Sequence, residues 1–121
     1  MRLTAFVLLA LAGFCPAHAQ EIDLSQPWGN ASGCVNKDGQ EVYAEDMLLL
    51  TEEALVLATG ACTFTSIETG EDGVLTADAL CEAEGEQAEN RFTIAPNPAN
   101  EAELIVSDFG GYEYGRVSRC E

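Results

Sequence analysis

The chain has little positive charge and almost no histidine. Five of its 121 residues are lysine or arginine, against 21 aspartates and glutamates, and the formal net charge is −16. A chain this acidic has no basic patch with which to bind nucleic acid or an anionic membrane. The only histidine is His18, and it lies in a segment that we expect to be removed. The remaining chain cannot form a Ser-His-Asp triad or a histidine-ligated metal centre. We therefore predict that the protein is not an enzyme and holds no cofactor.

The sequence has only one long apolar run, and it lies at the N-terminus. Arg2 precedes an apolar stretch over residues 3–14, and small residues, Ala17 and Ala19, follow at the spacing of a cleavage site. This layout is typical of a secretory signal. A buried N-terminal helix is the alternative, but the run has no amphipathic pattern. We predict a signal peptide over residues 1–19 and an exported protein, in the periplasm or secreted.

No membrane anchor is expected. The apolar run is too short to span a bilayer, and a lipid-attachment site requires a small residue before the cysteine, whereas Phe14 precedes Cys15. Residues 20–121 remain after the predicted cleavage. A chain of about 100 residues is one domain with a modest core.

Four cysteines remain in that domain. An even number in a small exported chain indicates two disulfides. A four-thiolate zinc site is the alternative, but such sites use close C-x2-4-C pairs, and no two of these cysteines are so close. The four residues are Cys34, Cys62, Cys81 and Cys120.

Short runs of strand-forming residues between turn formers predict an all-β fold. We expect a small antiparallel meander, half-barrel or sandwich-like, of about 5–6 strands, with a short helical turn near residues 31–35. Residues 46–59 could instead form a helix capped by Asp46 and ended by Gly60. We prefer a hairpin there, with one long strand over residues 54–68, because Leu55 and Leu57 alternate as in a strand.

A tight turn at residues 70–73 fixes the register of one hairpin. If Glu71 and Asp72 are the loop residues, Cys62 lies opposite Cys81, Phe64 opposite Ala79 and Ser66 opposite Ala77. Directly opposed cysteines are within bridging range. This favours the pairs Cys62–Cys81 and Cys34–Cys120, although three connectivities are possible for four cysteines.

The stretch CEAEGEQAE, residues 81–89, carries four glutamates. Glu82, Glu84, Glu86 and Glu89 could form a loose calcium site, although no EF-hand pattern fits around Gly39 or Gly73. We expect instead a strand that ends before Gly85, with residues 86–90 as the tip of a solvated loop.

Several of these features resemble a known group of proteins. They are Trp28-Gly29 before the first cysteine, a second cysteine in "ACTF", a third in "LCEAEGE", and a fourth at the C-terminus. The pattern resembles small exported four-cysteine periplasmic proteins of Gram-negative bacteria, whose function is unknown. The resemblance implies a periplasmic location and a disulfide-stapled β domain, and it carries over no functional residue.

Two functional hypotheses follow. The first is a non-catalytic module that binds a protein or envelope component, with Tyr112 and Tyr114 as contact residues because tyrosine is enriched at interfaces. Packing of these two side chains within their strand is the alternative, and we slightly favour it. Small acidic β domains include inhibitors of basic enzymes, an analogy of fold alone. The second is a divalent-cation (calcium) binding domain that uses the glutamates of residues 82–89. The acidity itself fits either solubility in a salty medium or attraction to a cationic partner.

Overall fold

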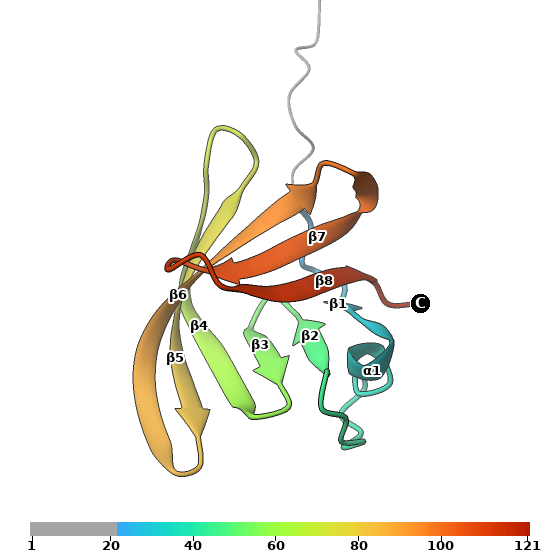
Figure 1. The fold of residues 1–121 in the computed structure, drawn as a ribbon, viewed down its shortest axis with the longest axis vertical. Coiled ribbons are helices and arrows are strands. Elements are labelled where there is room, and N and C mark those ends of the chain that lie inside the picture. Colours follow the sequence, from blue (N-terminus) through green and yellow to red (C-terminus); the bar gives the residue numbers. More distant parts are fainter. Residues whose placement is uncertain (1–21) are drawn as a thin grey trace, which may run out of the picture.

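Each strand of the protein pairs with the next one along the chain, and the last strand pairs with the first. The computed structural model describes residues 22–121, so the predicted signal peptide lies outside the described residues. Figure 1 shows the resulting closed antiparallel barrel. Its elements are β1 (Trp28–Gly29), α1 (Ala31–Cys34), β2 (Leu48–Leu50), β3 (Ala54–Leu57), β4 (Gly60–Thr69), β5 (Leu75–Ala83), β6 (Glu86–Asn97), β7 (Asn100–Asp108) and β8 (Glu113–Arg119).

The all-β antiparallel meander and its short helical turn are confirmed, whereas the expected number of strands is wrong. Eight strands close a full barrel, rather than 5–6 forming a half-barrel or sandwich. Two strands were not anticipated. The segment 54–68 divides into β3 and β4 at a turn over Ala58 and Thr59, and the two residues of β1 close the barrel between β2 and β8. Residues 46–59 form a hairpin and no helix.

The interior is filled by alternate residues of the strands, as an antiparallel wall around one core requires. In β5, for example, Leu75, Ala77 and Ala79 are buried while the residues between them are only partly so. The alternation places the apolar side chains inward and leaves the charged ones on the outer face. The largest fully buried side chains are Phe92, Leu50, Leu55, Ile94, Val106 and Val117.

The register of the β4–β5 hairpin agrees with the prediction as far as the pair Phe64 and Ala79. A bulge at Thr65 then shifts the ladder, so that Ser66 lies opposite Asp78 and not opposite Ala77. A bulge inserts one extra residue into one strand. Its effect here is to place the Ser66 hydroxyl beside the Asp78 carboxylate, to which it donates a hydrogen bond of 3.2 Å.

The predicted loop at residues 86–90 is wrong, because these residues belong to β6. The turn between β5 and β6 consists only of Glu84 and Gly85, which both have positive φ angles, 54° and 82°. Two consecutive residues with positive φ are the mark of a type I′ hairpin turn. The cluster of glutamates therefore lies on a regular two-stranded hairpin.

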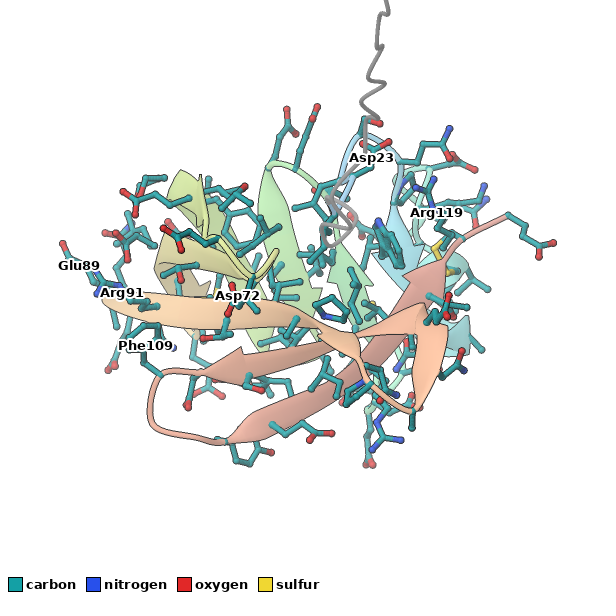
Figure 2. The ribbon with its side chains drawn as sticks, turned by 90° about the horizontal axis from the view of Figure 1, so that it is seen from above. Asp23, Asp72, Glu89, Arg91, Phe109 and Arg119 are labelled. Carbon is teal, nitrogen blue, oxygen red and sulfur yellow. A yellow bond between two sulfur atoms is a disulfide. The ribbon has the colours of Figure 1, made fainter. Side chains whose placement is uncertain are left out.

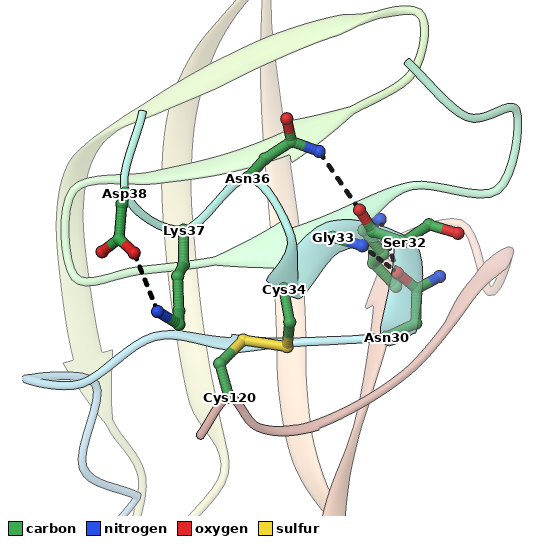
Figure 3. Close-up of a disulfide and its surroundings, with 9 residues drawn as sticks. Asn30, Ser32, Gly33, Cys34, Asn36, Lys37, Asp38 and Cys120 are labelled. Carbon is green, nitrogen blue, oxygen red and sulfur yellow. Dashed lines mark hydrogen bonds and ion pairs between the residues drawn. A yellow bond between two sulfur atoms is a disulfide. The ribbon is translucent and has the colours of Figure 1, made fainter. Parts of the chain in front are cut away.

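The structure contains both disulfides in the pairing that the register favours. Cys62 and Cys81 lie directly opposite each other on β4 and β5, with their Cα atoms 3.9 Å apart. Cys34 and Cys120 join α1 to the C-terminal end of β8, with a Cα–Cα distance of 5.4 Å (Figure 3). The second bridge thus ties together chain segments that are 86 residues apart.

The helical turn α1 is held in place by a cap and by close packing. The Asn30 side chain accepts a hydrogen bond of 2.7 Å from the Gly33 N–H, as an N-cap residue does (Figure 3). A Cβ atom on Gly33 would lie 2.0 Å from the carbonyl oxygen of Leu48. Only glycine allows the helix to lie this close to β2.

Candidate functional site

Tyr112 and Tyr114 lie at one end of the barrel, and their rings stack on the core. The ring of Tyr114 packs edge-on against the fully buried ring of Phe92, with the centroids 5.6 Å apart. Tyr112 in turn packs edge-on against Tyr114, at 4.9 Å. The side chain of Tyr112 is 64% exposed. An exposed aromatic ring is thereby fixed to the interior through a second ring, which limits the entropy that it would lose on binding a partner.

A tight turn after β7 positions these rings. The N–H of Asp108 donates to the Tyr112 carbonyl oxygen, and the Asp108 carboxylate accepts from the Tyr112 N–H, each over 2.9 Å. Gly111 adopts a φ of 97°, and its N–H donates to the Asp108 carbonyl oxygen. Residues other than glycine rarely adopt this φ. The turn is closed by three hydrogen bonds, so the position of Tyr112 is well defined.

The two tyrosines border a small hollow of about 230 Å³. Two carboxylate residues, Glu45 and Asp46, line its other side, and no lysine or arginine does. The Asp46 carboxylate accepts a hydrogen bond of 2.8 Å from the Ser32 hydroxyl. Aromatic rings and carboxylates both attract a cation. The remaining lining residues are apolar or hydroxyl-bearing: Met47, Leu48, Leu57, Ala58 and Thr59.

The local field at this end is negative. Burial raises the pKa of the Tyr114 hydroxyl above its ordinary value, and the charge of Asp108 raises it further, while a hydrogen bond with Asn90 opposes both effects. Burial disfavours the charged phenolate, and so does a neighbouring negative charge. Tyr114 therefore stays neutral over the physiological range, as its packing against the core requires.

The structure separates the four glutamates that were candidates for a metal site. Glu82 lies opposite Gln87, whose side-chain amide donates to it over 2.7 Å. Glu86 lies opposite Ala83, one position along the hairpin, so its side chain points to the other face of the sheet. Glu84 lies in the turn, and Glu89 is exposed further along β6. Within residues 22–121, no group of three or more potential ligands is arranged to hold a metal ion.

A second, wider hollow of about 670 Å³ lies on the outer face of β4, β5 and β6. Arg91 forms an ion pair with Asp78 across the β5–β6 ladder, and its guanidinium lies 5.2 Å from the centre of the Phe109 ring. Figure 2 shows Glu89, Arg91 and Phe109 gathered at one side of the molecule, away from Asp23 and Arg119. Phe109 is 60% exposed. This surface leaves no pattern in the sequence, because the bulge at Thr65 and the turn after β7 bring its residues together.

Each basic side chain of residues 22–121 has an acidic neighbour. The hydrogen bond from the Arg91 guanidinium lowers the pKa of the Asp78 carboxyl, and Asp78 raises that of Arg91. Exposed pairs like these contribute little to stability, but they leave no free cation on the surface. The four pairs are Lys37–Asp38, Arg91–Asp78, Arg116–Glu113 and Arg119–Asp23.

No protein-family model, no curated protein and no solved structure matches this chain. The resemblance to exported four-cysteine proteins therefore stays a prediction. In the part of the chain that the structure describes, no helix has the length and apolar character needed to cross a membrane.

Proposed function

We propose that this chain is a non-catalytic exported domain that binds a protein or envelope partner through the end of the barrel at Tyr112 and Tyr114. The observation that carries the proposal is the ring of Tyr112, exposed to solvent but anchored through Tyr114 on the buried ring of Phe92. Rigid, exposed tyrosines supply a large contact area at a low cost in conformational entropy.

Charge supports a cationic partner. The carboxylates of Glu45 and Asp46 border the same hollow, and all the basic side chains of the described residues already have acidic neighbours. A basic protein would therefore meet uncompensated negative charge, which speeds association and selects against acidic competitors. Blocking a basic enzyme, as an inhibitor does, is one form that such binding can take.

The chemistry of the chain supports a role without catalysis in an oxidising compartment. The four cysteines of the described residues are paired in disulfides, so none is available as a thiolate nucleophile. Disulfides persist in the periplasm and outside the cell. No observation on residues 22–121 favours the alternative role in calcium binding, because the glutamates of the β5–β6 hairpin are divided between its two faces.

Site-specific photo-crosslinking tests the proposal in cells that export the protein. A photoreactive phenylalanine analogue replaces Tyr112 in one variant and the exposed Ala99, in the turn at the other end of the barrel, in the control. We expect a discrete adduct from position 112 and none from position 99. A Tyr114→Ala variant carrying the crosslinker at 112 should lose the adduct, because its anchoring ring is gone. Equal labelling from both positions, or none, would reject this surface as the binding site.

A further inference from the structure

Half of β6 has a neighbour on one side only. β5 pairs with β6 along residues 86–94, whereas the pairing with β7 begins at Phe92. The chain turns away toward β8 after Asp108. Residues 86–91 therefore form a free sheet edge, and all of them are exposed.

The peptide groups on this edge can be assigned individually. The Arg91 carbonyl oxygen accepts a hydrogen bond of 3.1 Å from the Phe109 N–H, so it points away from β5. In a strand, residues two apart point their N–H and C=O groups to the same side. Those of Gln87 and Glu89 therefore point to the free edge as well. No hydrogen bond between residues 22–121 satisfies them there, whereas the Arg91 N–H is capped by the Asn90 side chain.

We infer that the free edge of β6 at Gln87 and Glu89 binds an extended, lysine- or arginine-rich segment of a partner protein by strand addition. An unpaired edge offers a row of donors and acceptors that an extended peptide satisfies with its own backbone. The added strand would lie in line with β7, beyond Phe109. Its backbone would form hydrogen bonds with the outward-pointing N–H and C=O groups of Gln87 and Glu89.

The charge of the edge selects the occupant. Glu86 and Glu89 lie on it, and Glu82 and Glu84 are next to them on the hairpin. A second copy of this chain would bring these carboxylates close together across the new ladder, which is destabilising. A lysine or arginine opposite Glu89 would instead form a cross-strand ion pair. The edge therefore disfavours self-association and favours a cationic strand.

The outer hollow adjoins this edge and fits the same occupant. Glu89 belongs to both, and Leu80 and Phe109 give the hollow an apolar part. The side chain of Glu89 lies on the outer face, opposite Leu80. A partner residue paired with Glu89 would also point its side chain to this face, so its aliphatic stem could lie along the hollow while its charged end meets Glu89.

This inference does not depend on the proposed role of the tyrosines, because it uses different residues and a different kind of contact. It rests on the unpaired peptide groups of β6, whereas the proposed role of the tyrosines rests on an exposed aromatic ring. A Tyr112→Ala variant should therefore bind a cationic strand as the unchanged protein does, and the two proposals can fail separately.

The test uses a seven-residue peptide of alternating lysine and threonine, blocked at both ends, with the oxidised protein at 150 mM salt. Binding is measured by fluorescence anisotropy, and amide hydrogen exchange by NMR. We expect exchange to slow at Gln87 and Glu89. A lysine opposite Glu89 directs its own N–H to β6, so methylating two lysine amides should weaken binding by about fivefold per hydrogen bond lost. Methylating two threonine amides should change it less than twofold.

The two methylated peptides have the same charge and composition, so they separate strand addition from simple attraction. A glutamate–threonine peptide should not bind, and Glu89→Pro, which removes an edge N–H, should lose binding while Tyr112→Ala keeps it. If Glu89→Pro does not fold, the comparison of the two methylated peptides still distinguishes strand addition from simple charge attraction. Equal loss from both methylated peptides, no binding of the lysine peptide, unchanged exchange at Gln87 and Glu89, or a concentration-dependent dimer of the free protein would each overturn the inference.

Discussion

Removing the disulfide between Cys34 and Cys120 should open the barrel where β1 pairs with β8, a junction that we call the seam. The bridge joins segments 86 residues apart. By the chain-entropy relation, a loop of this length restricts the unfolded chain enough to stabilise the fold by about 4–5 kcal/mol. The same relation gives about 3 kcal/mol for the pair Cys62 and Cys81, which are 19 residues apart. The double variant Cys34→Ala with Cys120→Ala should therefore lose a large part of a total stability of about 5–15 kcal/mol.

The location of the loss follows from the strand pairing. β1 has only two residues, and it meets β8 through Trp28 opposite Arg119 and Gly29 opposite Ser118. One further backbone hydrogen bond, from the Cys120 N–H to the Pro27 carbonyl oxygen, continues this ladder over 3.0 Å. Without the bridge, this short ladder and the exposed side-chain contacts of Arg119 with Asp23, Gln26 and the Trp28 ring would hold the N-terminal segment against β8. Local opening should therefore occur there first.

Two measurements test this reasoning. Urea unfolding, followed by the fluorescence of Trp28 without reductant, gives the change in free energy of unfolding. Native-state hydrogen exchange gives its location, and exchange should accelerate most at Gly29, Ser118 and Arg119. The control variant Cys62→Ala with Cys81→Ala should leave exchange at this seam unchanged. A loss below about 2 kcal/mol, or acceleration spread evenly over the barrel, would refute the entropic account and the seam.

The raised pKa of Tyr114 means that the folded state favours the neutral phenol. The free energy of unfolding should therefore be highest below the unfolded pKa of about 10 and should fall as the pH rises through the folded pKa. In a spectrophotometric titration, Tyr114→Phe should remove the tyrosine ionisation that occurs above pH 10, and loss of an ionisation below pH 10 would contradict the burial of Tyr114. The lowered pKa of Asp78 has the opposite effect, because its pairing with Arg91 stabilises the fold above the unfolded pKa of about 3.9 and is lost as the pH falls through the folded pKa. Asp78→Asn should therefore be less stable than the unchanged protein at pH 6 and equally stable near pH 2. A difference in stability that persists near pH 2 would contradict the role of the ion pair. Millimolar calcium should raise the melting temperature no more than sodium chloride of equal ionic strength, because Glu82 and Glu86 lie on opposite faces; a calcium-specific rise would revive the metal site.

The sequence predicts the β class and one hairpin register because both depend on local patterns. Alternation in residues 74–83 and a short turn over residues 70–73 suffice to place Cys62 opposite Cys81. The register then fails beyond Phe64, since a bulge at Thr65 leaves no mark in the alternation of a half-exposed strand. The pairing of Cys34 with Cys120 followed by elimination and not from any local pattern.

Closure of the barrel could not be predicted, because it depends on a strand of two residues. Trp28 and Gly29 lie in a segment rich in turn formers, and only their long-range partners on β2 and β8 make them a strand. The outer hollow was missed for the same reason: Phe109 reaches Arg91 through a turn that follows another strand. The two tyrosines could be identified, since aromatic residues beside a Gly-Gly turn are visible in the sequence, but the burial of Tyr114 against Phe92 could not.

The negative charge on the unpaired edge of β6 affects which chains can pair with that edge. A closed barrel removes most sheet edges, and with them the main route by which β proteins aggregate. Here β6 extends beyond β7, so its residues 86–91 keep an open edge, which carries Glu86 and Glu89 where an edge strand often carries lysine. Carboxylates prevent self-pairing as well as lysines do, but they admit the opposite class of partner. The glutamates that suggest a metal site in the sequence thus have another role available in the structure: they keep an open edge free of its own copies while leaving it accessible to a cationic strand.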